Sequence, residues 1–478
     1  MSTEETDATV AEALAASLNS KRAAFTRDPN ASYATRLDRL DRLSALVKSN
    51  ESRIIDALDT DFGCRSRTET VLAEIMSTQS AIRYARRNLR KWMRRRGHHT
   101  SFWSQPAKVY AQAQPLGVVG IMAPWNYSLD LSLSPLSAAL AAGNRVMLSM
   151  SEETPSLCAL LQELFAQSFA ADEVSVFQGG AVLSPAFARL PFDHLLFTGS
   201  TRVGRLVAQA AATNLTPVTL ELGGKSPAIV APDFDVTEAA ARIGWGKGFN
   251  AGQTCAAPDY VFVPAAVQDA FAEAVLDKFA HSYASMEDSD LTAIISERFY
   301  RRLEDLIAEA EAGGAQILRP EGYAPIARDG VFKMPMTVVL NAPLDCRLMA
   351  EEIFGPVLPV LTYESIGQVI DYVNERDRPL SLYVFSHDRR LIQRVQQGTV
   401  SGSLGVNETL LQYIQEDLAF GGVGSSGQGA YHGQAGFDTF SHLKSVFVQQ
   451  GLGHLTGIKL LHPPYGPVAR FLIRMMKN

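Results

Sequence analysis

The thiol of Cys255 stands among small residues in the segment Gly248–Tyr260, between a helical pattern and an apolar run. A cysteine on a short turn between two such elements is open to a substrate and can act as a nucleophile. The commoner role of a lone cysteine is that of a small buried hydrophobic residue. Other motifs in the chain are needed to decide between the two roles.

A carboxylate, Glu221, follows the apolar run 218–220 and precedes Gly223-Gly224, where a strand ends and the backbone can turn tightly. A surface glutamate is the ordinary alternative, but a charge in this place indicates a purpose. Two further blocks stand out, namely Ala123–Tyr127 and Met349–Pro356.

These four blocks together resemble those of the NAD(P)-dependent aldehyde dehydrogenase superfamily. The resemblance extends from about Asp61 to His442. It is strongest to the class 3 branch and, within it, to coniferyl-aldehyde dehydrogenases. The features that carry this placement are the short N-terminus and the segments 61–66, 257–260, 431–433 and 437–440.

The resemblance implies a catalytic role for three residues. Cys255 would attack the aldehyde and carry it as a thiohemiacetal and then as a thioester. The side-chain amide of Asn126 and the backbone amide of Cys255 would stabilise the oxyanion, although Asn126 taken alone favours a turn residue. Glu221 would be the general base that activates water.

The resemblance also implies NAD as the cofactor, with NADP as the second candidate, and no metal. Glycines in the segment Phe197–Gly204, at a strand-to-helix turn, let the backbone approach a pyrophosphate. Their spacing is not the ordinary dinucleotide fingerprint. The expected cofactor-binding residues are Trp125, Glu152, Gly199, Ser200, Gly204, Leu222, Glu352 and Phe354.

Composition describes an ordinary globular protein, with 46% hydrophobic and 20% charged residues. The net charge of -6 argues against a nucleic-acid partner, so the basic segment Arg86–Arg96 is interpreted as a solvated helix end. Four scattered cysteines favour a reducing compartment. The acidic N-terminus and the lack of an apolar run of about 18 residues favour a cytoplasmic enzyme without a membrane span.

Alternating strand and helix patterns predict an α/β fold with two doubly wound domains and a small β bridging domain. The expected cofactor-binding domain comprises residues 1–97 and 119–224, and the catalytic domain residues 225–406. Residues 98–118 and 407–478 form the bridging segment, which by resemblance serves a homodimer, and the C-terminal tail.

Some details are also expected. Residues 69–96 are predicted as one helix, Ser49 or Asn50 as a helix cap, and residues 111–115 as a connection between two strands. The segment 420–427 is predicted to lie outside the core because of its glycines.

The leading functional hypothesis is NAD-dependent oxidation of an aromatic or medium-chain apolar aldehyde, with Tyr127 and Phe420 as guesses for pocket walls. A rival is a catalytically impaired binding or structural protein, because Ser149 stands where the family has a lysine that binds the adenosine ribose. A third hypothesis is a cofactor-independent esterase that uses the same thiol.

Ser149 generates a testable prediction. Losing an ammonium donor to the ribose hydroxyls is expected to weaken cofactor binding by roughly ten- to a hundredfold. NAD remains preferred over NADP, because Glu152 repels a 2′-phosphate. Dissociation constants should therefore show tighter NAD binding in Ser149→Lys, and NADP held as tightly as NAD by the unaltered chain would refute the expectation.

Overall fold

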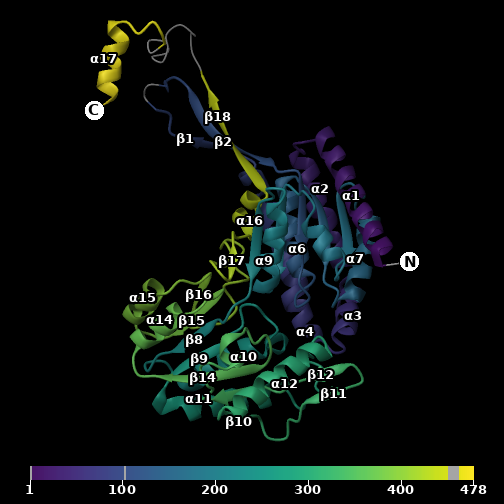
Figure 1. Cartoon of the computed structure of the whole chain (residues 1–478), viewed down its shortest axis with the longest axis vertical. Helices are drawn as coiled ribbons and strands as arrows, with labels where there is room; N and C mark the ends of the chain where they lie inside the picture. Colours follow the sequence, from purple (N-terminus) through teal and green to yellow (C-terminus); the bar gives the residue numbers. More distant parts are fainter. Residues whose placement is uncertain (1–2, 102–103, 450–461, 478) are drawn as a thin grey trace.

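The structure, a computed structural model, describes residues 3–101, 104–449 and 462–477. Its two large sheets have six and seven strands, and a three-stranded sheet extends from one end of the molecule (Figure 1). The α/β fold with two doubly wound sheets and a small β element is therefore confirmed.

The six-stranded sheet has the order β17-β7-β6-β3-β4-β5 and is parallel except for β17. Its strands are nearly continuous apolar runs, as expected for a parallel sheet that is buried on both faces. The strands are β3 (Val118–Met122), β4 (Arg145–Met150), β5 (Val174–Gln178), β6 (His194–Gly199), β7 (Val218–Leu222) and β17 (Gly427–Gln428).

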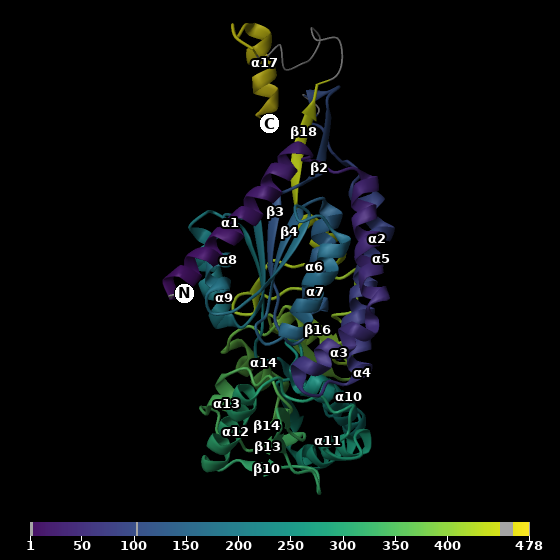
Figure 2. The same ribbon diagram turned by 90° about the vertical axis from the view of Figure 1, so that its right-hand side faces the viewer.

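Helices cover both faces of this sheet (Figure 2). One face packs against α2 (Tyr33–Ser49), α3 (Glu51–Phe62), α5 (Ser77–Trp92), α6 (Asp130–Ala142), α7 (Pro155–Ser168) and α16 (Gly433–Thr439). The other face packs against α1 (Thr3–Arg27), α8 (Leu183–Ala188) and α9 (Thr201–Ala212).

The strand order reverses between β3 and β6, because β4 and β5 extend from β3 in one direction and β6 and β7 in the other. In open parallel sheets, ligands bind outside the carboxyl ends of the strands at such a reversal. The segments that follow β3 and β6 here begin with Ala123 and Ser200, respectively. The topology thus gathers the predicted cofactor segments at one edge.

The seven-stranded sheet has the order β10-β13-β14-β9-β8-β15-β16 and is parallel except for β10. Its strands are β8 (Pro227–Val230), β9 (Tyr260–Pro264), β10 (Gln316–Leu318), β13 (Thr337–Leu340), β14 (Val357–Tyr363), β15 (Ser381–Phe385) and β16 (Ser403–Val406). On one face lie α10 (Val236–Gly248) and α11 (Gln268–Ser282); on the other lie α12 (Glu297–Ala312), α13 (Arg347–Ala350), α14 (Ile366–Asn374) and α15 (Arg389–Gly398).

The three-stranded sheet joins β1 (Arg96–His98), β2 (Lys108–Pro115) and β18 (Ser441–Val448). Strand character in residues 440–449 and their pairing with the 109 region are confirmed, since Phe447 pairs with Val109. A short hairpin, β11 (Ile326–Arg328) with β12 (Val331–Lys333), and helices α4 (Arg67–Thr70) and α17 (Pro467–Met476) complete the described chain. Among the described helices, none combines the length and apolarity that crossing a bilayer requires.

Several local predictions were wrong. Residues 111–115 continue β2 instead of forming a connection, because they pair with β18. The long helix changes at Val71–Met76 into a π-helical turn and ends at Trp92. Asn50 does occupy the N-cap position of α3, as predicted, but its side chain makes no capping hydrogen bond and donates to the carbonyl of Leu46 instead.

The glycine-rich segment 420–427 is also closer to the core than predicted. Gly427 pairs with Glu221 at the edge of the six-stranded sheet, and Ser426 is fully buried. Strand β7 therefore does not end before Glu221, which lies inside it between β6 and β17. A glycine suits this strand because a β-carbon at Gly427 would lie 2.4 Å from the carbonyl oxygen of Leu220.

Candidate active site

The turn that carries Cys255 starts where α10 ends at Gly248. Asn250, Ala251 and Gly252 all have left-handed backbone, with φ of 52°, 51° and 71°. Such a conformation costs a residue like alanine roughly 1–2 kcal/mol, and it persists only where the surroundings enforce it. A β-carbon at position 252 would lie 2.3 Å from the carbonyl oxygen of Gly355, so this turn packs directly on that of the Glu352–Pro356 segment.

Asn126 is held against this turn. It lies just after β3, is buried, and donates its side-chain amide to the carbonyl of Gln253 at 3.1 Å. Asn250 donates back to the carbonyl of Asn126 at 3.3 Å. Next to it, the hydroxyls of Tyr127 and Thr254 are 2.6 Å apart. The structure therefore places the Asn126 amide beside the segment that leads into Cys255.

Glu221 is buried, and neither of its carboxyl oxygens has a hydrogen-bond partner among the described residues. Burial raises the pKa of this carboxyl well above its usual value. The side chain points to the sheet face opposite Leu220 and Leu222, because side chains alternate along a strand. A carboxylate there would be a stronger base than one in water.

Glu352 lies directly over the backbone of Gly223, since a β-carbon there would be 2.0 Å from a carboxyl oxygen. Its carboxylate accepts a hydrogen bond from the backbone of Gly224. Burial, followed by the charge of Asp259, raises the pKa of Glu352 to about 8.

A charge cluster that the sequence analysis did not assign supports the loop of Glu352. Asp259 accepts from the Ile353 backbone at 3.1 Å and forms ion pairs with Lys225 and, at 3.6 Å, with Lys247. Lys225 also donates to the carbonyls of two residues of the 348–351 region. The sequence analysis used Asp259 only as part of the segment 257–260 that supports the resemblance.

The three acidic groups interact electrostatically. Burial is the main factor that raises the pKa of the Cys255 thiol to about 12, and the charges of Glu352 and Glu221 add to it. The two carboxyls are therefore near the sulfur, although Cys255 itself is only partly buried. The structure brings together the nucleophile and base that the sequence predicts.

A cavity of about 380 Å³ reaches Cys255 from one side. Its walls are mainly apolar and come from the π-helical turn, α5, α6, α10 and residues 410–416, which the sequence analysis did not predict. They include Leu72, Met76, Leu131, Trp245, Phe249, Leu411 and Ile414. Of the two guesses, Tyr127 lines the cavity, whereas Phe420 packs behind it against His432, whose ring lies 5.6 Å away.

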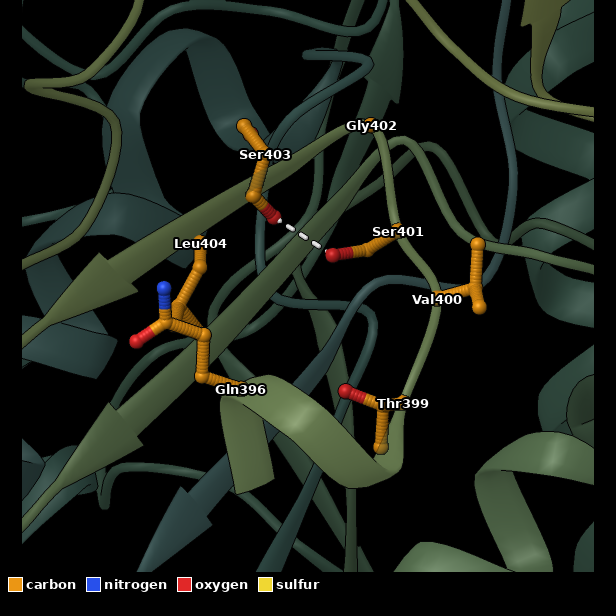
Figure 3. Close-up of a pocket in the computed structure, with 7 residues that line it drawn as sticks. All are labelled: Gln396, Thr399, Val400, Ser401, Gly402, Ser403 and Leu404. Carbon is orange, nitrogen blue, oxygen red and sulfur yellow. Dashed lines mark hydrogen bonds between the residues drawn. The ribbon is translucent and has the colours of Figure 1, made fainter. Parts of the chain in front are cut away.

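A second cavity, of about 260 Å³, lies beside β16 at the edge of the seven-stranded sheet (Figure 3). It is lined by residues 396–404, among them Ser401, whose hydroxyl donates to the carbonyl of Ser403 at 2.9 Å. Its lining holds no charged or thiol side chain, so it lacks groups for the chemistry described above. Within the described ranges, no cluster of three or more His, Cys, Asp or Glu is arranged to hold a metal ion.

The predicted cofactor residues surround the carboxyl edge of the six-stranded sheet. Ser200 caps α9, a helix whose N-terminus favours an anion. Gly204 allows close packing, because a β-carbon there would be 2.5 Å from Leu222. The rings of Trp125 and Phe354 are 5.3 Å apart, edge to face.

Glu152 is exposed and lies just after β4. Ser149 lies buried in β4, paired with Met122 and Phe177. Alternation places its side chain on the same face as Met147, the face that α9 covers. A lysine at position 149 would therefore point to the sheet face that α9 covers, and the N-terminus of α9 is part of the predicted cofactor site.

A thiol, a side-chain amide and buried carboxyls thus lie close to the edge of a doubly wound sheet, an arrangement typical of nucleotide-dependent enzymes. The profile of the aldehyde dehydrogenase family matches residues 2–446. The chain belongs to the aldehyde dehydrogenase family, and the resemblance inferred from its motifs is confirmed.

Comparisons with individual proteins also support the family assignment. A probable coniferyl aldehyde dehydrogenase of Pseudomonas aeruginosa is 45% identical over 455 residues, which cover 95% of this chain and 94% of that protein. The substrate-bound structure of Staphylococcus aureus AldH superposes with a TM-score of 0.89 at 36% identity, covering 96% of this chain and 98% of that one. The NAD+ complex of a Bacillus cereus aldehyde dehydrogenase gives 0.83 at 27% identity, covering 92% and 89%.

The charges around Cys255 generate a prediction. Removing the carboxylate of Glu352 removes a repulsion that opposes the thiolate, so Glu352→Gln should lower the pKa of Cys255. In the cofactor-free enzyme at pH 9 to 10, where Glu352 is largely ionised, iodoacetamide should alkylate Cys255 several-fold faster in the variant. Equal or slower alkylation of the variant would contradict this electrostatic account.

Proposed function

We propose that the chain oxidises an aromatic, coniferyl-like aldehyde or a medium-chain apolar aldehyde to the carboxylic acid, with NAD as the hydride acceptor. The single observation that carries this proposal is Cys255 at the inner side of an apolar cavity, beside the Asn126 amide and two buried carboxyls. The cavity supplies the apolar binding site for the substrate.

In this proposal, the thiolate of Cys255 attacks the carbonyl carbon, and a carbon–sulfur bond forms while the oxygen becomes an alkoxide. The Asn126 amide and the backbone N–H of Cys255 stabilise that negative oxygen. Bound NAD supplies the acceptor for the hydride that leaves the same carbon. The thioester then stays on Cys255 until water cleaves it to the acid and restores the thiol.

Glu221 is proposed to take the proton from that water. A general base is most effective when its pKa lies near the working pH, and burial raises the pKa of Glu221 above its usual acidic value. Its oxygens are without partners in the described chain, so they are available to a water molecule. This availability supports the base role better than a structural one.

The chain's own residues fit a dinucleotide. The α9 N-terminus with Gly199, Ser200 and Gly204 would hold the pyrophosphate, and Glu352 and Phe354 the nicotinamide ribose and ring. Trp125 and Leu222 pack at the same edge, and Glu152 lies exposed beside it for the adenosine ribose. The Bacillus cereus relative was solved with NAD+, which supports NAD here. We propose NAD over NADP because Glu152 would repel a 2′-phosphate.

The substrate class rests on the cavity and on the relative from Pseudomonas aeruginosa, which is named for coniferyl aldehyde. Four aromatic side chains, Tyr127, Trp245, Phe249 and Tyr413, line the cavity and suit an aryl group. The domain division, homodimer and cytoplasmic location remain predictions. The predicted division assigns β17 to the bridging segment 407–478, whereas the structure places it in the six-stranded sheet.

The test is a comparison of three activities in the wild type and in Cys255→Ala. We expect the wild type to form NADH with aromatic aldehydes and with aliphatic aldehydes, and to hydrolyse p-nitrophenyl acetate. Each of these three activities should fall by at least a thousandfold in Cys255→Ala. NADH formation that persists in the variant would remove the mechanism. Ester hydrolysis without NADH would favour the esterase hypothesis, and neither activity would favour the impaired protein that Ser149 suggests.

A further inference from the structure

Three charged side chains outside the reaction steps described above are buried next to the site. Arg65, Glu69 and Glu74 come from one segment that includes α4 and the π-helical turn Val71–Met76. Arg65 and Glu74 are fully buried and form an ion pair at 3.2 Å, and Glu69 is 8% exposed. Burying such charges is costly unless they are paired with other groups, so their partners show what they do.

Glu69 binds the turn that carries Cys255. Both of its carboxyl oxygens lie 3.1 Å from the backbone nitrogen of Asn250, which donates to them, and Thr292 donates its hydroxyl at 2.6 Å. Asn250 is the first of the left-handed residues in that turn. A negative charge that accepts this N–H therefore holds a backbone conformation that is strained by itself.

Glu74 binds the segment that carries Asn126. One carboxyl oxygen accepts from the backbone nitrogens of Leu129 and Asp130, each at 2.9 Å, at the start of α6. Its partner Arg65 lies over the ring of Tyr127, with 5.5 Å from the guanidinium carbon to the ring centre. Glu74 thus fixes the turn three residues after Asn126.

The π-helical turn explains how one short segment reaches both places. Residues five apart, such as Glu69 and Glu74, point about 140° apart on an α-helix with 3.6 residues per turn. A π-helical turn bonds residues five apart, which brings them toward one face. Here that turn spans Val71–Met76, so it begins two residues after Glu69 and contains Glu74. π-Helical turns of this kind are frequently found at functional sites.

We propose that Glu69 and Glu74 are a pair of positioning residues that hold the two oxyanion donors, the Cys255 backbone and the Asn126 side chain, at the correct separation. The inference rests on the proposed function, because it concerns the oxyanion of that reaction. Neither carboxylate touches the substrate; each acts through the backbone that it binds. Burial raises the pKa of both carboxyls to about 7, which fits their place inside the protein.

The test separates a reaction that forms an oxyanion from one that does not. Acyl transfer from p-nitrophenyl acetate to Cys255 passes through an oxyanion, whereas alkylation of the same sulfur by iodoacetamide does not. Glu69→Leu and Glu74→Leu should lower kcat for aldehyde oxidation and for acyl transfer by at least tenfold each, with KM for NAD within twofold. Their alkylation rates should stay within threefold of the wild type.

Glu69→Gln and Glu74→Gln keep an acceptor oxygen and should recover part of the lost acyl transfer, which places them between the wild type and the leucine variants. The matched control is Glu173→Leu. Glu173 is likewise a carboxylate that joins two parts of the chain, through Arg39 and Arg42 of α2, but it is only partly buried and precedes β5 at the opposite edge of the sheet. This variant should leave acyl transfer unchanged.

The inference would be overturned if acyl transfer and alkylation fell together in the Glu69 or Glu74 variants, or if acyl transfer in the leucine variants equalled that of the wild type. A fall of acyl transfer in Glu173→Leu equal to theirs would also overturn it. Failure of the proposed function is distinguishable, because a wild type that forms no NADH with any aldehyde still reports on this inference through the ester and alkylation assays.

Discussion

The structure depends on one electrostatic constraint, which is that three acidic groups lie close together inside the protein, where much of the water is removed. Cys255, Glu221 and Glu352 each have a raised pKa, and in each case burial is the main cause. The groups also oppose one another, because the two carboxyl charges disfavour the thiolate. The negative charge of the reaction therefore needs neutral donors fixed in place, and the surrounding fold provides them.

The two large parallel sheets meet at the edges that carry these residues, and this arrangement brings the three acidic groups together. The carboxyl ends of β3 and β6 lead into Asn126 and Ser200, while Cys255 and Glu352 precede the amino ends of β9 and β14. The edges are joined by short contacts, such as that of Asn126 with Gln253 and that of Glu352 over Gly223. Nucleotide binding and covalent chemistry thus come from different sheets and meet where these edges face one another.

Much of this could be predicted from the sequence. Strands such as β3 and β9 are apolar runs between clear helical patterns, so their type and parallel pairing follow from local signals. Asn126 and Cys255 lie in recognisable motifs between such elements, and Glu221 lies in a third, although inside β7 and not after it. The predictions were wrong where partners distant in the sequence decide the structure. Residues 111–115 (Ala-Gln-Ala-Gln-Pro) form a strand because they pair with β18, and Gly427 forms one because it pairs with β7.

The supporting charges were missed for a related reason. Nothing local distinguishes Glu69, Glu74 or Asp259 from surface residues, because their burial depends on backbone donors or on charges from distant parts of the chain. The cavity walls come from five separate segments of the chain, so they could not be predicted from the sequence either. In each case, the sequence contains the residue but not the neighbour that gives it a role.

The most direct test of the account is to look for the acyl group on the sulfur. Glu221→Gln mixed with an aromatic aldehyde and NAD, quenched in acid and mapped by peptide mass spectrometry, should form NADH in a single burst and carry the acyl group on Cys255. The account predicts this trapped thioester because hydrolysis, and not its formation, needs the Glu221 carboxylate. Continuous NADH formation with Cys255 unmodified, or the acyl group on another cysteine, would contradict it.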